Sequence, residues 1–318
     1  MHTQVTAATE YPLHADSLAG QQDELAQRIL RLTPAPGVQP SAIGGLTLIR
    51  ADSPSQPLSS IYEPSLCIVV QGRKRAVLAD EVYVYDALKY LVVSVTLPMT
   101  GQIIDASPER PYLCLRIGLD TQMIGELLLQ VGPTQASRPN GDRGLFVAST
   151  SAALLDAVVR LMRLLDQPRD AAVLAPLVMR EIHYLVLVGE LGQRLRELCI
   201  ADSQAQRIAR AIDLLRTRYA ESLRIDDLAA AAHMSVSSLH HRFKAITALS
   251  PVQFQKQLRL HEARRLMLTE GMEAAVAAHR VGYESPSQFS REYRRLYGSP
   301  PRREIATMRD MNAGASAS

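Results

Sequence analysis

Two stretches near the end of the chain repeat each other at a distance of fifty residues. VGYESPSQFSREYRRLYGSPP (281–301) aligns with HMSVSSLHHRFKAITALSP (233–251) at its serine, large apolar, basic and proline positions. The matched pairs are Ser235 with Ser285, Ser237 with Ser287, Leu239 with Phe289, Phe243 with Tyr293, Lys244 with Arg294 and Pro251 with Pro301. Such a duplication requires the same local fold to be built twice.

Each copy predicts a short capped helix that follows a second helix. Ser285, Pro286 and Gln288 form the pattern of an N-cap, a proline in the first helical position and a capping-box partner. Alanine-rich segments, IDDLAAAAH from Ile225 and MEAAVAAHRVG from Met272, precede the two capped helices. Because small side chains let helices approach closely across a short turn, the sequence predicts two helix-turn-helix units.

The segment between the copies and the local charge both favour DNA as a partner. PVQFQKQLRLHEARRLMLTE (251–270) predicts one helix of about five turns, which could present both units to one side of a duplex whose turns repeat at about 34 Å. Residues 203–318 hold 18 lysines and arginines against 11 acidic residues, whereas the whole chain is only +3 and its remainder is therefore −4. A positive field confined to this third is expected if it alone meets a polyanion.

These features together resemble the DNA-binding domain of AraC/XylS-type transcription regulators over about residues 205–305. The resemblance is carried by DLAAAAHMSVSSLHHRFKAITALSP, RLHEARRLML and VAAHRVGYESPSQFSREYRRLYGSPP. One departure is Ala248, where family members commonly have the glycine that ends the first recognition helix; the second copy keeps it as Gly298. The resemblance implies binding of double-stranded DNA, with base reading at Ser237, His240, His241, Ser287, Gln288, Ser290 and Arg291.

Side-chain chemistry separates base reading from positioning. Arg291 can pair with guanine O6 and N7, and Gln288 can pair with adenine, whereas a histidine pair such as His240 and His241 is less specific. Further along the two helices we expect contacts with phosphates, which position a protein without reading sequence. These residues are Lys244, Arg294 and Arg295.

Upstream, short β-branched or alternating runs replace the helical period. They predict an antiparallel sandwich or small barrel, preceded by the amphipathic helix DELAQRILRL. The runs are LTLIRAD from Leu46, SLCIVVQG from Ser65, RAVLADEVYVYD from Arg75, YLVVSVT from Tyr90 and PYLCLRIGLD from Pro111. YEPSLCIVVQGRKRAVLADEVYVYDALKYLVVSVTLPMTGQI and PERPYLCLRIGLD also resemble the N-terminal domain of one subgroup of the same family. That resemblance implies a cupin-like β-barrel that senses a small molecule or otherwise regulates the protein.

Histidines and cysteines restrict the chemistry of this half. Before residue 200 the only histidines are His2, His14 and His183, so we expect no cupin-type metal site, no cofactor and no catalytic residues. Cys67 lies within an apolar strand, and Cys114 shares a strand face with Arg116, whose charge can lower a thiol pKa. Both cysteines are therefore sensor candidates, although free cysteines often only pack in a core.

Residues 151–200 return to a helical period in SAALLDAVVRLMRLLDQ and VLAPLVMREIHYLVLVGELGQRLREL. These helices could pack on the barrel or form a homodimer contact, and the sequence leaves both alternatives open. No run approaches 18 apolar residues, and the start, MHTQVTAATEYPLHADSLAG, lacks a basic stretch followed by an apolar core. We therefore expect a cytoplasmic protein with no membrane partner.

The expected fold class is α+β and multidomain, with an N-terminal cupin-like β-barrel, a helical connecting region and a C-terminal all-α domain of two helix-turn-helix units. The boundaries we expect are a flexible N-terminus (1–20), a sensor domain (21–148), a helical linker or dimerisation region (149–202), a DNA-binding domain (203–305) and a flexible tail (306–318).

The function indicated is sequence-specific regulation of transcription, with an N-terminal domain that responds to a small molecule or a reactive species. RNA polymerase is a further partner if the protein is an activator, and the sequence does not separate activation from repression. One alternative is a cupin-type or sugar-modifying enzyme that carries a DNA-binding appendage. Another is an architectural DNA binder with little sequence preference and no effector.

Overall fold

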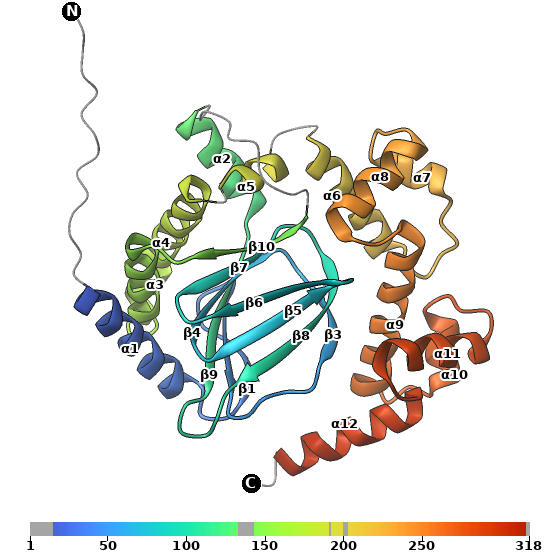
Figure 1. Ribbon diagram of the computed structural model, residues 1–318, viewed down its shortest axis with the longest axis horizontal. Coiled ribbons are helices and arrows are strands. Elements are labelled where there is room, and N and C mark those ends of the chain that lie inside the picture. Colours follow the sequence, from blue (N-terminus) through green and yellow to red (C-terminus); the bar gives the residue numbers. More distant parts are fainter. Residues whose placement is uncertain (1–14, 133–142, 191, 200–202, 316–318) are drawn as a thin grey trace, which may run out of the picture.

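Two antiparallel sheets form the centre of the molecule in a computed structural model that describes residues 15–132, 143–190, 192–199 and 203–315 (Figure 1). The larger sheet has the order β1 (Gly37–Pro40), β2 (Leu46–Ala51), β9 (Tyr112–Gly118), β4 (Ser65–Gln71), β7 (Lys89–Val93) and β10 (Leu145–Ser149). The smaller sheet has the order β3 (Leu58–Tyr62), β8 (Leu97–Asp105), β5 (Arg73–Leu78) and β6 (Glu81–Asp86). The sheets face each other as a barrel-like sandwich, which agrees with the expected fold class.

Strands β4 and β9 lie in the middle of the larger sheet and are buried on both faces. Leu66 pairs with Ile117 and Ile68 with Leu115, and these residues occupy one face. Because side chains alternate along a strand, Cys67, Val69, Tyr112 and Cys114 occupy the opposite face, toward the smaller sheet. The larger sheet therefore needs a cover on its outer side as well as a partner sheet on its inner side.

Five helices pack around this sheet. They are α1 (Ala15–Leu32), α2 (Thr121–Val131), α3 (Ala152–Leu164), α4 (Pro168–Val188) and α5 (Gly192–Cys199). Glu24 of α1 bonds Arg163 of α3 at 2.6 Å, and Val158 and Ile182 of α3 and α4 are buried in the same core as the strands. Helices α3 and α4, which lie in the region predicted as a helical linker or dimerisation region (149–202), thus pack on the barrel, which is one of the two alternatives that the sequence left open.

Helix α4 meets the length and composition test for a membrane span, contrary to our expectation from its sequence. An 18-residue window has a mean hydropathy of 1.6, and 33% of it is buried. Near its middle, Arg180 bonds Glu126 at 3.0 Å and Glu181 bonds Arg160 at 2.6 Å. Ion pairs to neighbouring helices, together with buried Ile182, are typical of a helix packed on a sheet.

The C-terminal part is entirely helical among the residues described. It comprises α6 (Gln204–Thr217), α7 (Ile225–Ala231), α8 (Val236–Thr247), α9 (Pro251–Thr269), α10 (Ala274–Arg280), α11 (Pro286–Tyr297) and α12 (Pro301–Ala315). The fifty-residue offset holds at both ends of α8 and α11. Ser235 and Ser285 cap their starts, and Ala248 (φ 62°) and Gly298 (φ 79°) end them in the left-handed conformation. Ala248 thus adopts the same left-handed backbone conformation that Gly298 adopts in the second copy.

Three local expectations were wrong. Gln288 does not complete a capping box with Ser285, because its side-chain nitrogen bonds Glu292 instead; the reciprocal box is formed by Ser250 and Gln253 at the start of α9. Helix α1 begins at Ala15, so part of the predicted flexible N-terminus is helical, and α12 continues through most of the predicted flexible tail. Residues 1–14 and 316–318 lie outside the described part.

The two helix-turn-helix units have different cores. Buried residues of the first unit, such as Leu239 and Phe254, belong to a cluster that is continuous with the barrel core. Those of the second unit, including Phe289 and Tyr293, form a separate cluster. The first unit is therefore packed as an extension of the regulatory domain, whereas the second has its own core.

Candidate nucleic-acid interface

Helix α8 buries one face and presents the other to solvent. Leu239, Phe243 and Ile246 are buried, and the rings of Phe243 and Phe254 pack edge to face with centroids 5.4 Å apart. This packing fixes the rotation of the helix about its axis. The polar and basic side chains that it leaves exposed include Ser237, His240, His241 and Lys244.

Helix α11 is oriented in the same way by Phe289 and Tyr293, which are both fully buried. Ser290 is half-buried on this helix. The exposed side chains are Ser287, Gln288, Arg291, Arg294 and Arg295. Among the residues that the structure describes, no ion pair involves these three arginines. The expected base-reading and phosphate-binding positions are therefore accessible, apart from the partial burial of Ser290.

Gln288, in the first turn of α11, belongs to a network of polar side chains. Its amide nitrogen donates to Glu292 at 3.1 Å, and Glu292 also accepts from Lys256 at 2.9 Å and from Tyr283 at 2.8 Å. Although burial alone would raise it, these hydrogen bonds lower the pKa of Glu292. A base contact would have to compete with the Glu292 carboxylate for the Gln288 amide. The sequence did not predict this contact.

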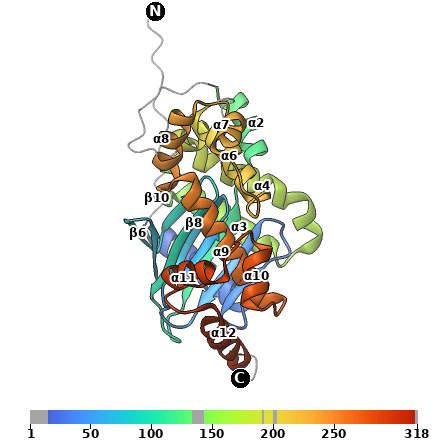
Figure 2. The same ribbon diagram turned by 90° about the vertical axis from the view of Figure 1, so that its right-hand side faces the viewer.

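Helix α9 connects the two units, with α8 and α11 near its opposite ends (Figure 2). Arg259 of α9 donates to the carbonyl of Tyr219 at 2.7 Å and to that of Gly282 at 2.8 Å. A Cβ at position 282 would lie 2.1 Å from the carbonyl oxygen of Ala220, so only glycine allows this approach. The connection between the units is thus stiffened by hydrogen bonds on both sides of α9.

The regulatory domain caps the C-terminal end of α8. Arg143 donates to the carbonyls of Lys244 at 2.9 Å and Ala245 at 2.8 Å, and the amide of Gly144 donates to the carbonyl of Ile246 at 3.0 Å. Glu81 of β6 holds the Arg143 guanidinium at 2.5 Å. The carbonyl of Lys244 also accepts from the amide of Ala248 at 2.9 Å, so these contacts chiefly satisfy the carbonyls of Ala245 and Ile246, which would otherwise need water.

The Arg143 contact was not found from the sequence, because nothing in its local sequence distinguishes it from an ordinary loop arginine. A second contact between the domains joins Arg216 of α6 to Glu63, which precedes β4, at 2.7 Å. Glu63 also accepts a hydrogen bond from Thr96 at 3.0 Å. Both contacts attach the first helix-turn-helix unit to the barrel.

Cys67 and Cys114 lie inside the barrel and are 4% and 1% exposed. The neighbouring Cys114, aided by the charges of Lys74 and Arg116, lowers the pKa of Cys67 to about 7 against the opposing effect of burial. The interaction with Cys67 and burial both raise the pKa of Cys114. Within the described ranges, no group of three or more histidine, cysteine or acidic side chains could hold a metal ion.

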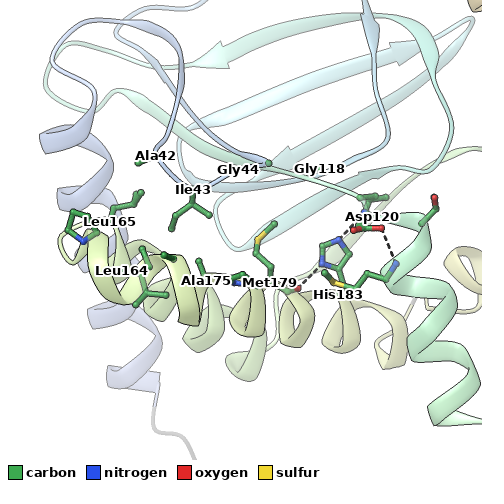
Figure 3. Close-up of a pocket in the computed structure, with 18 residues that line it drawn as sticks. Ala42, Ile43, Gly44, Gly118, Asp120, Leu164, Leu165, Ala175, Met179 and His183 are labelled. Atoms are coloured by element: carbon green, nitrogen blue, oxygen red, sulfur yellow. Dashed lines mark hydrogen bonds between the residues drawn. The ribbon is translucent and has the colours of Figure 1, made fainter.

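A pocket of about 930 Å³ lies outside the barrel, between α4 and the loops that precede β2 and follow β9 (Figure 3). Its lining is mainly apolar and includes Ile43, Met123 and Met179. At one end, ring nitrogens of His183 bond the carbonyl of Met179 at 2.7 Å and the amide of Asp120 at 3.2 Å. His183 was a poor metal-ligand candidate in the sequence, and the structure shows that both its nitrogens hold the pocket wall.

Two family models match the chain. Residues 42–194 match the model described as AraC-type transcriptional regulator N-terminus, and residues 228–305 match a helix-turn-helix domain. The chain belongs to the AraC-type family of transcriptional regulators. The first match includes α3 and α4, in agreement with their packing on the sheet.

Curated relatives cover only parts of this AraC-type chain. The transcriptional activator RhaS of Pectobacterium carotovorum is 24% identical over 119 residues, which are 37% of this chain and 43% of RhaS. RhaS of Escherichia coli is 26% identical over 150 residues, which are 47% and 54% of the two chains. A putative AraC-like regulator of Streptomyces lividans is 35% identical over 94 residues, or 30% and 31%. The chain thus spans about half or less of the length of these relatives.

Among solved structures, ToxT of Vibrio cholerae has the same fold. Apo ToxT gives a TM-score of 0.55 at 11% identity and covers 84% of this chain and 98% of ToxT. ToxT bound to an unsaturated fatty acid gives the same TM-score and identity over 82% and 93% of the two chains. At this identity the likeness shows the fold alone, including a barrel and helical domain in one chain.

We predict that Arg143→Ala loosens the end of α8. The variant leaves the carbonyl of Ala245 without its donor and removes one of the two donors to the carbonyl of Lys244, at a local cost of about 1–3 kcal/mol. Hydrogen-exchange mass spectrometry of the full chain should show faster exchange at residues 143–149 and 244–249. Arg110→Ala, in an exposed turn, serves as the control. Unchanged exchange in Arg143→Ala would show that the cap contributes no local stability.

Proposed function

We propose that this AraC-type chain regulates transcription by sequence-specific binding of double-stranded DNA through α8 and α11. The observation that carries this proposal is the duplicated helix, with buried aromatic anchors on one face and exposed polar and basic side chains on the other. The activator name of the RhaS relatives supports activation, with RNA polymerase as a partner. DNA binding also supports a place in the cytoplasm.

We assign base reading to seven positions and phosphate contact to three, by the chemistry of their side chains and their exposure. The base-reading positions are Ser237, His240, His241, Ser287, Gln288, Ser290 and Arg291. The phosphate positions are Lys244, Arg294 and Arg295. We propose no catalytic role, since the family to which the chain belongs consists of transcriptional regulators.

Alanine substitutions of Arg291 and Arg294 should reduce DNA affinity in different ways. Arg291→Ala should cost about 1–3 kcal/mol on the specific site and relax preference at one base pair, whereas Arg294→Ala should weaken specific and non-specific DNA equally. The target sequence is first selected from genomic DNA with the full chain, and affinities for it and for a scrambled duplex are then measured by fluorescence anisotropy. Circular dichroism checks the fold of both variants. Equal losses on every sequence for Arg291→Ala would refute its assignment to base reading.

We also propose that the protein forms a homodimer through α4. One face of this helix buries Val178, Ile182 and Val186 in the core. Another exposes large apolar side chains whose spacing places them on one stripe. They are Val173 (68% exposed), Leu177 (61%), Tyr184 (41%) and Val188 (45%). Helix α4 lies on the side of the barrel opposite the DNA-binding helices, so a symmetric contact there leaves them accessible (Figure 1).

Leu177→Glu should weaken this dimer. A carboxylate in an apolar contact should raise the dimer dissociation constant at least about tenfold. Sedimentation velocity over a range of concentrations measures the change in the full chain. Leu129→Glu is the matched control, because Leu129 is 88% exposed on α2. A wild-type protein that stays monomeric at high concentration, or equal effects of the two substitutions, would rule out α4 as the contact.

We assign a small, mainly apolar effector to the pocket beside α4. A volume of about 930 Å³ falls within the range of ligand pockets, and flexible methionines such as Met123 and Met179 adapt to different shapes. Because the pocket and the exposed stripe share α4, a ligand there could change the dimer contact. The fatty acid named in one ToxT structure is consistent with an apolar effector in this fold.

Filling this pocket should block binding. The uncharged probe N-phenyl-1-naphthylamine should bind with increased fluorescence, and Ala172→Trp should weaken that binding at least about tenfold by occupying the space. Leu174→Trp is the control, since Leu174 is exposed on the same helix but neither lines the pocket nor belongs to the proposed dimer stripe. Equal binding by Ala172→Trp and the wild type would exclude the pocket as the site of the probe.

A further inference from the structure

The barrel interior holds a polar cluster that DNA binding does not use. Cys114 of β9 faces Val69 of β4, and Cys67 of β4 faces Arg116 of β9. The two cysteines are therefore diagonal neighbours on the same face of adjacent strands. Around them lie Ser65 of β4, Tyr62 of β3, Lys74 of β5, Tyr85 of β6 and Tyr112 of β9.

The two thiols share the barrel interior with an ammonium group. The Cys114 thiol donates to the carbonyl of Leu115 at 3.5 Å, and the positive charge of Lys74 favours the thiolate form of both cysteines. The Nζ of Lys74 lies 5.4 Å from the centroid of the Tyr62 ring, and it makes no ion pair with a carboxylate in the described part of the chain. A cation without a carboxylate partner next to two thiols stabilises the reactive form of cysteine.

Other features show that the cluster is accommodated by the barrel wall. A Cβ at Gly101 would lie 2.1 Å from the hydroxyl of Tyr62 and 3.2 Å from Cε of Lys74, so the absent side chain provides the space that these two groups occupy. The buried hydroxyl of Tyr85 has no hydrogen-bond partner. Cysteines that serve only to fill a core need neither an inward-facing lysine nor an unsatisfied hydroxyl beside them.

We propose that Cys67 and Cys114 form a redox-active dithiol that closes to a disulfide on reaction with a hydroperoxide, and that this closure changes DNA binding. The second half of the proposal rests on the proposed function, whereas the first does not. A nucleophilic thiolate with a second thiol beside it on the neighbouring strand is the arrangement in which the first product of oxidation is captured before it is oxidised further.

With hydrogen peroxide, the reaction has two steps. The Cys67 thiolate attacks one peroxide oxygen, the O–O bond breaks, and hydroxide leaves while Cys67 becomes a sulfenic acid. The Cys114 sulfur then attacks the Cys67 sulfur, the S–O bond breaks, and the departing hydroxide takes the Cys114 proton to form water. Overall, two electrons pass from the dithiol to the peroxide, whose two oxygens take up the two thiol protons. The products are one disulfide and two waters.

Closure would strain the strands that carry the cysteines. Diagonal neighbours have Cα atoms about 7–8 Å apart, whereas a disulfide usually needs Cα atoms within about 6.8 Å, so β4 and β9 must shift. Strand β4 begins two residues after Glu63, whose carboxylate bonds Arg216 of the first DNA-binding helix, α6, at 2.7 Å. A shift of β4 can therefore reach the DNA-binding domain through one ion pair.

The disulfide is tested in the reduced, full-length chain. After treatment with hydrogen peroxide and alkylation, peptide mass spectrometry should show a Cys67–Cys114 cross-link that dithiothreitol removes. Cys199→Ser, which removes the third cysteine, should keep the cross-link. Cys114→Ser should lose it and leave a sulfenic acid on Cys67 that dimedone traps. A folded wild-type chain that gives no cross-link would overturn the proposal.

Lys74 is tested as a positioning residue by the rate of the same reaction. Lys74→Gln should slow cross-linking about fivefold at pH 7, because a rise of about one unit from a thiol pKa of about 7 lowers the thiolate fraction by that factor. Lys74→Arg should restore most of the rate because it keeps the charge. Equal rates for Lys74→Gln and the wild type would show that the ammonium has no part in activating the thiols.

DNA binding is measured separately, by anisotropy with the selected target sequence. Oxidation should change the dissociation constant at least about fivefold in the wild type and leave Cys114→Ser unchanged. A cross-link without a change in affinity would overturn the regulatory half of the proposal. Reduced protein that binds no DNA would instead refute the proposed function, while the mass-spectrometric result on the dithiol would stand.

Discussion

The larger sheet must be covered on both of its faces, and the rest of the structure depends on this requirement. Strands β4 and β9 bury side chains on both sides, so the outer face needs α1, α3 and α4 and the inner face needs the smaller sheet. Helices that must cover a sheet cannot also be a free linker. Polar groups on the enclosed inner side depend on partners within the protein, and the buried hydroxyl of Tyr85 is left without one.

The duplicated DNA-binding units are alike in sequence and unequal in their surroundings. The first is joined to the barrel by Arg143, by the amide of Gly144 and by Arg216, and its core continues into that of the regulatory domain. The second has its own aromatic core, with Phe289 and Tyr293 packed at 5.4 Å between ring centroids. A signal that arises in the barrel therefore has a direct hydrogen-bonded route to α8, whereas α11 adjoins the barrel chiefly at β3 among the described elements and is joined to the first unit by α9.

Sequence patterns predicted the helices and strands whose formation depends on residues close together in the chain. The capped helices of the repeat and central strands such as β4 and β9 follow from N-cap chemistry and from alternation of apolar residues. Strand β3 (LSSIY) escaped prediction because its two serines hide the alternation, and it is held in the sheet by pairing with β8, including a contact of 3.3 Å between the hydroxyls of Ser59 and Thr100. Arg143 and the partner of Gln288 are tertiary contacts, to which no local pattern points.

Glu292 shows why exposure alone does not define the face of α11 that meets DNA. Its carboxylate accepts from Gln288 and from Lys256, so one amide expected to read a base and one nearby cation are already occupied within the protein. The positive charge that α11 offers to a duplex therefore comes from Arg291, Arg294 and Arg295, which make no ion pair in the part of the chain that the structure describes. To contact adenine, the Gln288 amide must break its hydrogen bond to Glu292. The free energy gained from the base contact must therefore exceed the cost of leaving that carboxylate with one donor fewer.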